Sequence, residues 1–356
     1  MKHYTNILVT GGCGFIGSHF IRHLFHKYPQ YRITNLDALT YAGNPENCAD
    51  IEACEVGRAD DEKRYRFVQG DIADISLLDG LFRTGDFDLV VHFAAETHVD
   101  RSHFDVADFI RTNIEGTRCL FEMSRIYRIP RFVHISTDEV YGSIPHGQFA
   151  AEEAPLRPSN LYSTSKAGGD LLVQSMMRVY KVPALIVRGS NNFGPYQYPE
   201  KLIPLAVTNL IEGIKIPIHG TGEHVRSWLH VDDFCAAVDL IAHKGADGAI
   251  YNVSGDEHTN LEVLIMVAAH LGKDLGRYRA HTHDRPNADL RYAPDSSKLQ
   301  KELGWARRHH IEDAIGDVVG WYKKNEGWWK KIKATGVYQE YYGRQANAEW
   351  DGPTRV

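Results

Sequence analysis

The stretch N-I-L-V-T-G-G-C-G-F-I-G, residues 6–17, decides the fold. Residues 6–10 have the apolar pattern of a short buried strand, and residues 15–28 repeat apolar side chains at helical spacing. The turn between them contains four glycines: Gly11, Gly12, Gly14 and Gly17. A turn without side chains lets the backbone approach a pyrophosphate, which then lies at the positive N-terminus of the helix. The stretch therefore predicts a dinucleotide-binding unit; the alternative is a glycine-rich turn in an unrelated α/β protein.

The end of the second predicted strand, residues 33–37, indicates which dinucleotide is bound. Asp37 closes this strand about 20 residues after Gly17, where a carboxylate accepts hydrogen bonds from ribose hydroxyls and repels a 2′-phosphate. We therefore expect NAD rather than NADP. Asp71 and Ile72 follow the third predicted strand and are placed to meet the adenine, although such a pair also serves as a simple strand-end cap.

Strands and helices alternate along the first half of the chain. Further strands are predicted at 65–71, 89–94, 132–136 and 184–187, with helices at 106–126 and 163–181. This order is typical of a doubly wound parallel sheet, a Rossmann-type NAD-binding fold, followed by a smaller C-terminal α/β substrate domain. The predicted division is 1–190 with return segments at about 228–256 for the NAD-binding domain, 191–227 and 257–330 for the substrate domain, and 331–356 for a loosely held tail. Residues 45–64 are expected to form an exposed connection.

The composition excludes several classes of protein. The 356 residues are 43% hydrophobic and carry a formal net charge of -6 without a basic stripe, which argues against a nucleic-acid partner. The five cysteines form no C-x-x-C pair, so neither a metal site nor a disulfide framework is expected. No segment reaches the run of about 18–20 apolar residues that is needed to span a bilayer. The expectation is a cytoplasmic protein with no membrane partner.

The stretch S-T-D-E-V-Y-G, residues 136–142, ends the fifth predicted strand with two adjacent carboxylates, Asp138 and Glu139. Such a pair can supply an acid and a base, because mutual repulsion separates their pKa values; a helix cap is the alternative. Further along, Tyr162 and Lys166 share one helix face. An ammonium beside a phenol is expected to lower the pKa of the phenol, which then takes a hydroxyl proton while hydride leaves for the nicotinamide. A surface pair is the alternative.

Several motifs together resemble one enzyme family. They are T-G-G-C-G-F-I-G, H-F-A-A-E-T-H-V-D-R-S, S-T-D-E-V-Y-G, Y-S-T-S-K, S-N-N-F-G-P-Y-Q-Y-P-E-K-L-I-P, H-V-R-S-W-L-H-V-D-D and D-R-P-N-A-D-L-R-Y-A. The chain is similar to extended short-chain dehydrogenases/reductases, in the sugar-nucleotide epimerase and dehydratase group, over about residues 6–330. The T-D-E-V-Y-G segment resembles the 4,6-dehydratases of that group, whereas epimerases carry small or uncharged residues in place of its two acids.

The resemblance implies a lyase that removes water from dTDP-glucose through transient oxidation at C4. In that mechanism Tyr162 removes the O4 proton, Glu139 takes the C5 proton and protonated Asp138 donates to the departing C6 hydroxyl. Thr137 forms a hydrogen bond with the same substrate hydroxyl, and Lys166, whose ammonium lies beside the phenol of Tyr162, is the fifth catalytic residue. The implied NAD contacts are Gly11, Gly14, Phe15, Ile16, Gly17, Asp37, Asp71, Ile72, Ala94, Ala95, Thr97, Asn113, Ser136, Tyr162 and Lys166. The implied substrate contacts are Asn191, Glu200, Lys201, Leu202, Arg226, Asn260 and Arg285, with no metal. Thr97 and Asn113 have an alternative role as capping residues.

The sequence departs from the family pattern at several positions. Leu161 stands where Pro usually precedes the tyrosine, Phe193 where Tyr is common, and Asn287-Ala288 where Gly-His is usual. The last change removes an expected diphosphate-contacting histidine, so UDP-, CDP-, GDP-linked or N-acetylated sugars stay open as substrates. A nucleotide-sugar 4-epimerase and a non-catalytic scaffold are the further alternatives. The resemblance also implies a homodimer, with the helices at 106–126 and 163–181 packed across a two-fold axis.

Overall fold

A seven-stranded parallel sheet forms the larger part of the molecule. The computed structural model describes residues 2–347. The strand order is β10-β6-β5-β4-β1-β2-β3. From β1 the chain first adds strands on one side and then, at β4, continues on the other side, as in the predicted Rossmann-type fold. The strands are β1 (Asn6–Thr10), β2 (Arg32–Asp37), β3 (Tyr65–Gln69), β4 (Leu89–His92), β5 (Phe132–Thr137), β6 (Ala184–Gly189) and β10 (Ile250–Val253). Register pairs such as Ile7 with Ile33 and with Leu89 show that β1 lies at the centre of the switch.

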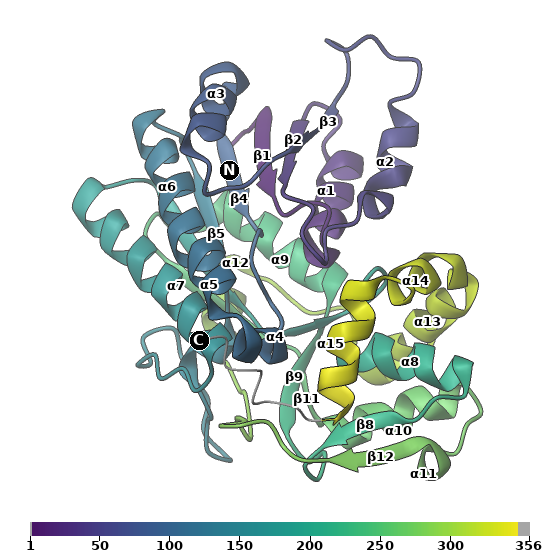
Figure 1. Cartoon of the computed structure of the whole chain (residues 1–356). Helices are drawn as coiled ribbons and strands as arrows, with labels where there is room; N and C mark the ends of the chain where they lie inside the picture. Colours follow the sequence, from purple (N-terminus) through teal and green to yellow (C-terminus); the bar gives the residue numbers. More distant parts are fainter. Residues whose placement is uncertain (1, 348–356) are drawn as a thin grey trace, which may run out of the picture.

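Helices cover both faces of this sheet (Figure 1). One apolar core joins the sheet to α1, α9 and α12, and a second core joins its other face to α3, α6 and α7. Both faces of the strands are therefore buried, which explains their continuous apolar runs. The covering helices are α1 (Phe15–Lys27), α3 (Ile75–Gly85), α5 (Val106–Ile110), the π-helical turn η2 (Arg111–Gly116), α6 (Thr117–Ile126), α7 (Leu161–Tyr180), α9 (Val231–Lys244) and α12 (Ser297–Leu303).

A smaller lobe lies beside the carboxyl ends of the strands. Two small sheets, ordered β11-β9-β7 and β12-β8, pack with helices around a separate apolar core. Its elements are β7 (Asn191–Phe193), α8 (Leu202–Glu212), β8 (Ile216–His219), β9 (Val225–His230), β11 (Asp256–Thr259), α10 (Asn260–His270), α11 (Leu275–Tyr278), β12 (Arg279–Thr282), α13 (Ile311–Lys324), α14 (Glu326–Lys333) and α15 (Gly336–Asn347). The domain boundaries given above remain a proposal.

The segment that was expected to be a tail is packed in its described part. Residues 336–347 form α15, whose Tyr338 is buried in the core of the smaller lobe and donates a hydrogen bond to the carbonyl oxygen of Pro199. The expectation of a loosely held segment is therefore wrong for residues 331–347, and residues 348–356 lie outside the described part. Aromatic side chains four apart, at Tyr338 and Tyr342, give this polar helix one apolar face.

The connection at 45–64 also differs from the expectation. It begins with η1 (Pro45–Cys48) and α2 (Ala49–Cys54), and Cys48 and Ile51 are fully buried. The Asn47 side chain donates to the carbonyl oxygen of Cys13 in the glycine turn. Most side chains of residues 45–64 are exposed, as expected, but Asn47, Cys48 and Ile51 are buried, so the first half of the connection also supports the glycine turn.

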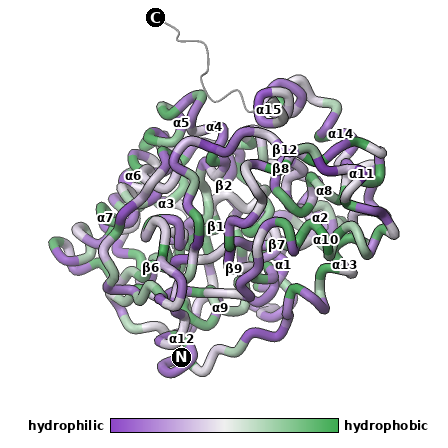
Figure 2. Tube along the Cα trace, turned by 90° about the horizontal axis from the view of Figure 1, so that it is seen from below, coloured by the Kyte–Doolittle hydropathy of each residue, from purple (hydrophilic) through white to green (hydrophobic). Residues whose placement is uncertain are grey.

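Hydropathy along the trace matches this arrangement. Figure 2 shows hydrophobic stretches running through the interior, whereas outer loops and helix ends are mostly hydrophilic. Among residues 2–347, no helix is both long enough and apolar enough to cross a membrane.

Candidate active site

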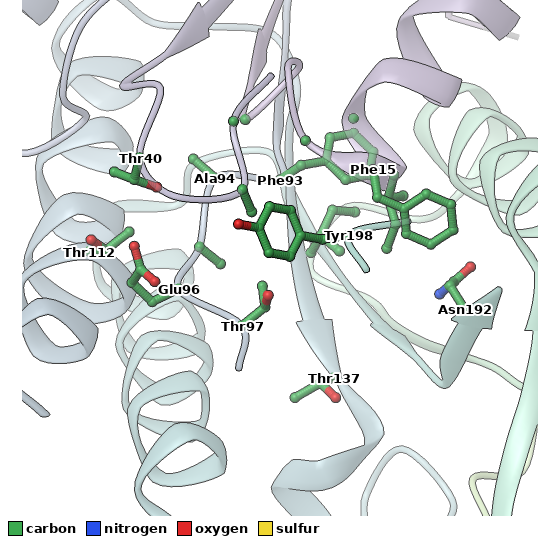
Figure 3. Close-up of a pocket in the computed structure, with 18 of the residues that line it drawn as sticks. Phe15, Thr40, Phe93, Ala94, Glu96, Thr97, Thr112, Thr137, Asn192 and Tyr198 are labelled. Carbon is green, nitrogen blue, oxygen red and sulfur yellow. The ribbon is translucent and has the colours of Figure 1, made fainter. Parts of the chain in front are cut away.

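A cavity at the carboxyl ends of the parallel strands gathers most of the predicted cofactor residues. Those lining it are Gly11, Gly14, Phe15, Ile16, Gly17, Asp37, Asp71, Ile72, Ala94, Ala95, Thr97, Ser136, Tyr162 and Lys166. In Figure 3, Thr40, Glu96 and Thr112 gather on one side of this cavity and Phe15 and Asn192 on the other, with Thr137 at the end of β5. The strand ends therefore bring together residues that are far apart in the sequence.

The glycine turn is shaped for close approach of a dinucleotide backbone. Gly11 has a positive φ of 71°, and a Cβ there would lie 2.6 Å from the backbone nitrogen of Ala94. A Cβ on Gly17 would lie 2.2 Å from the carbonyl oxygen of Gly11. Asp37 accepts hydrogen bonds from the backbone of Cys13 (2.9 Å) and Leu39 (2.8 Å), which fixes its carboxylate at the edge of the cavity. The residues present fit an NAD molecule, because a carboxylate that accepts two hydrogen bonds retains further lone pairs for ribose hydroxyls.

Two predicted cofactor residues are engaged with the protein itself. Asp71 forms an ion pair with Arg111, with 2.7 Å between Oδ2 and Nη2, although it also lines the cavity. Asn113 lies on the π-helical turn η2, and its amide joins the backbone of Glu96 to the hydroxyl of Ser165. Asn113 is buried outside the cavity lining. Its contact with the cofactor stays a prediction, and its amide holds the cavity wall at Glu96 from behind.

The acidic pair stands where β5 passes into a short 3-10 helix, η3 (Asp138–Tyr141). Thr137 caps this turn by accepting a hydrogen bond from the backbone of Glu139, so the cap role belongs to Thr137 and both carboxylates face the site. Gly142 ends the turn at a φ of 71°, where a Cβ would lie 2.2 Å from the carbonyl oxygen of Arg157. The strand end therefore fixes Asp138 and Glu139 in one place.

The two carboxyl groups have different electrostatic surroundings. Burial raises the pKa of Asp138 well above its usual value, and the neighbouring Glu139 raises it further. Burial also raises the pKa of Glu139, but the cationic groups of Arg226 and Lys201 oppose that shift, as does a hydrogen bond from Tyr292. The pair is thus arranged for a protonated Asp138 beside an ionised Glu139.

Tyr162 and Lys166 lie on the first turns of α7. The helix begins at Leu161, and Asn160 and Ser163 form a capping box at its start. Burial raises the pKa of Tyr162, and the carboxylates of Glu139 and Asp138 add to this effect, while a hydrogen bond from Thr137 opposes it. The predicted lowering of the pKa of Tyr162 is therefore wrong. Lys166 donates to the carbonyl oxygen of Ile135 (2.7 Å), and burial lowers its own pKa to about 8.

A second cavity continues from the first towards the smaller lobe. All seven predicted substrate residues line it: Asn191, Glu200, Lys201, Leu202, Arg226, Asn260 and Arg285. Lys201, Arg226 and Arg285 supply cationic side chains to its wall, and such groups suit a diphosphate. Leu202, Leu205 and Pro217 supply apolar wall, and Ala288 lines the cavity at the position of the missing histidine. Glu139 lines both cavities and so marks where they meet.

Sequence reasoning missed several residues of the site. The hydroxyl of Tyr292 donates to Glu139 (3.2 Å) and to Asp289 (2.8 Å), and its ring lies 4.3 Å from the guanidinium of Arg226. Glu96 lines the cofactor cavity, where burial raises its pKa to about 7. Gln345 of α15 lines the substrate cavity. Tyr292 and Glu96 lie within two of the family motifs quoted from the sequence, and that position could have identified them as site residues. Gln345 lies in the segment that was expected to be a tail, where no motif points to the site.

Known nucleotide-sugar dehydratases are similar to this chain over most of its length. A model of the GDP-mannose 4,6 dehydratase family matches residues 8–318. A dTDP-glucose 4,6-dehydratase of Streptomyces niveus is 44% identical over 333 residues, which make up 92% of this chain and 96% of the relative. The chain belongs to the nucleotide-sugar 4,6-dehydratase family.

Solved structures of this dehydratase family share the fold. A dTDP-glucose 4,6-dehydratase of Streptomyces venezuelae, solved with NAD and TYD bound, is 44% identical with a TM-score of 0.86, covering 92% of this chain and 99% of that one. The enzyme of Bacillus anthracis, solved in complex with NAD, is 42% identical with a TM-score of 0.84, covering 92% and 100%. The predicted fold class is confirmed by these matches.

Proposed function

We propose that this protein is a dTDP-glucose 4,6-dehydratase, a lyase that converts dTDP-glucose to the 4-keto-6-deoxy sugar with loss of water. The observation that carries the proposal is the Asp138–Glu139 pair, in which Asp138 lines the first cavity and Glu139 lines both cavities. An oxidation or an epimerisation needs only Tyr162 and Lys166, whereas elimination across C5 and C6 needs one further acid and one further base.

The first cavity binds NAD through its glycine turn, Asp37 and the wall of the strand ends. When bound, NAD would supply the hydride chemistry, as acceptor of the hydride from C4 and donor of the hydride to C6, and its oxidised nicotinamide would add a positive charge. Relatives solved with NAD support this assignment. Ser136, buried at the end of β5 and lining this cavity, has a hydroxyl without a hydrogen-bond partner within the described residues. That unsatisfied hydroxyl is a ready contact for the cofactor.

Each catalytic side chain moves or holds one proton. Tyr162 takes the O4 proton as a phenolate: in the complex, the positive charges of the oxidised nicotinamide and of Lys166 would oppose the burial that raises its pKa, and Thr137 donates a hydrogen bond to the phenolate oxygen. Lys166 also donates a hydrogen bond to the carbonyl oxygen of Ile135 in β5. Glu139, whose ionised form Arg226 and Lys201 favour against the effect of burial, takes the C5 proton that the 4-keto group has made acidic. Asp138, protonated because it is buried beside another carboxylate, gives its proton to the departing C6 hydroxyl.

The second cavity holds the nucleotide diphosphate and the sugar. Arg226 and Arg285 bind the diphosphate, Asn191, Glu200 and Lys201 bind near the sugar, and Leu202 and Asn260 line the base end. The loss of a histidine at Ala288 removes one phosphate contact but leaves both arginines in the lining. The thymidine nucleotide is proposed from the relatives.

Incubation of the purified protein with dTDP-glucose tests the proposal. We expect a product that absorbs in alkali as a 4-keto sugar, with slower or no turnover of UDP-, CDP- and GDP-glucose. Formation of dTDP-galactose without loss of water would show a 4-epimerase instead. Absence of any turnover with all four nucleotide sugars would favour a non-catalytic scaffold.

The proposal includes a homodimer. Val106 and Ile110 on α5 and Leu161 and Leu171 on α7 are apolar side chains that are 37–51% exposed, as expected of helices that pack against a second copy. Size-exclusion chromatography with light scattering should report a dimer, and Leu171→Glu should shift it towards the monomer. A cytoplasmic location is also proposed, because all five cysteines are free thiols.

A further inference from the structure

Two adjacent buried residues at the start of α4 (Val99–Phe104) each form an ion pair with a residue that lines the substrate cavity. Asp100 pairs with Arg285, with Oδ1 to Nε at 2.5 Å and Oδ2 to Nη2 at 3.0 Å. Arg101 pairs with Glu200, with 3.0 Å between Nε and Oε2. Asp100 and Arg101 are only 2% and 6% exposed. Both side chains of the Arg101–Glu200 pair are therefore shielded from solvent, whereas the Asp100–Arg285 pair is open to solvent on its Arg285 side. One dipeptide therefore orients both a cation and a carboxylate of the cavity.

Helix α15 reaches both members of this dipeptide. The side-chain amide of Gln345 donates to Oδ2 of Asp100 at 2.9 Å. The ring of Tyr341 lies 3.9 Å from the guanidinium of Arg101, and the ring of Tyr41, from the loop after β2, lies 3.7 Å from it. Both views of the chain show α15 beside α4 (Figures 1 and 2). The segment that the sequence presents as a polar tail thus reaches the buried side of the site.

These contacts restrict how the two ion pairs can move. A buried carboxylate is stable only when its oxygens accept hydrogen bonds, and Gln345 satisfies one that Arg285 does not fully occupy. A guanidinium held by aromatic rings keeps its plane, and hence the direction of its bond to Glu200. Neither Tyr341 nor Gln345 has to touch the reacting atoms for this effect.

We propose that Tyr341 and Gln345 are positioning residues, and that α15 sets the geometry of the substrate cavity through them. Tyr341 acts through Arg101 on Glu200 at the sugar end, whereas Gln345 acts through Asp100 on Arg285 at the diphosphate. This inference rests on the proposed function, since it assumes that the cavity takes a nucleotide sugar. It predicts that two residues one helical turn apart affect different parts of one substrate.

Four variants separate the two effects. Gln345→Ala removes the hydrogen bond to Asp100, and Gln339→Ala makes the same chemical change on an exposed position of α15. Tyr341→Leu removes the ring above Arg101, and Tyr341→Phe keeps it. The measurements are kcat and KM with dTDP-glucose, Tm, and the calorimetric Kd of the tightest-binding nucleotide among dTDP, UDP and GDP.

Gln345→Ala should raise the nucleotide Kd about tenfold, the loss expected for a hydrogen bond to a charged group, and Gln339→Ala should not. Tyr341→Leu should raise KM about fivefold with nucleotide Kd unchanged, and Tyr341→Phe should restore the KM. If Tm falls while Kd and KM stay within twofold of the parent protein, α15 is only structural and the inference is wrong.

The wild-type protein separates this inference from the proposed function. A wild type that binds a nucleotide without turning over dTDP-glucose contradicts the proposed reaction, but the nucleotide Kd of Gln345→Ala still tests the role of α15. A wild type that binds none of the three nucleotides contradicts both.

Discussion

Replacing Glu139 by Gln should stop removal of the C5 proton. The substitution keeps the shape of the side chain but removes the base, and a positioned general base contributes about 10²–10⁴ in rate. That range corresponds to about 3–5 kcal/mol of activation free energy. In the structure, the carboxylate lies at the junction of the cavities, and Arg226 and Lys201 favour its ionised form. The loss should therefore approach the upper part of the range.

The assay follows exchange of the C5 proton of the 4-keto product with D₂O by proton NMR. Glu139→Gln should slow this exchange by about 10³–10⁴-fold, the upper part of the expected range. Tyr292→Phe is the matched control, because it retains the Glu139 carboxylate and removes the hydroxyl that donates to it at 3.2 Å and to Asp289 at 2.8 Å. That bond lowers the pKa of Glu139, so its loss raises the pKa, and the acidic limb of the exchange profile should move to higher pH. Exchange in Glu139→Gln within threefold of wild type would remove Glu139 from the base role.

Three further variants test other parts of the site. Asp138→Asn should abolish dehydration yet raise Tm at pH 7. The pKa of Asp138 is raised in the folded protein, so the free energy of unfolding falls as pH rises from the unfolded pKa towards the folded pKa, by about 1.4 kcal/mol for each unit of pKa shift, and Asn avoids this cost. An unchanged Tm, by thermal unfolding at pH 4 and 7, would argue against a buried neutral acid. Arg226→Gln should weaken dTDP binding by a factor of about 10–100, measured by calorimetry, and a change below twofold would remove it from the diphosphate site. Gly17→Ala should abolish NAD retention, measured in the purified protein by absorbance after denaturation, because its Cβ would meet the carbonyl oxygen of Gly11 at 2.2 Å; full NAD content would contradict the cradle.

The parts of the site that could be predicted from the sequence are those built from neighbouring residues. A pyrophosphate cradle needs contiguous glycines between a strand and a helix, and the Tyr162–Lys166 spacing places both side chains on one face of α7. Asp138 and Glu139 occupy one turn, so their adjacency was visible before the fold was known. The alternation of strands and helices also predicted the doubly wound parallel sheet, although not the order of its strands.

What could not be predicted depends on contacts between distant segments. Tyr292 reaches Glu139, and Gln345 reaches Asp100, across separations that no local pattern reports. The pKa of Tyr162 was mispredicted because the spacing of Tyr and Lys shows neither the burial of the phenol nor the two carboxylates beside it. The motif that contains Asn113 likewise does not show that its side-chain amide forms two hydrogen bonds with the backbone of Glu96.

The mass spectrum of the product formed from dTDP-glucose in D₂O tests the central claim most directly. If Asp138 and Glu139 act as the acid and base of an elimination, the product has lost one water and carries a solvent deuterium at C5. A product with the mass of the substrate, or a dehydrated product without deuterium at C5, would contradict the account.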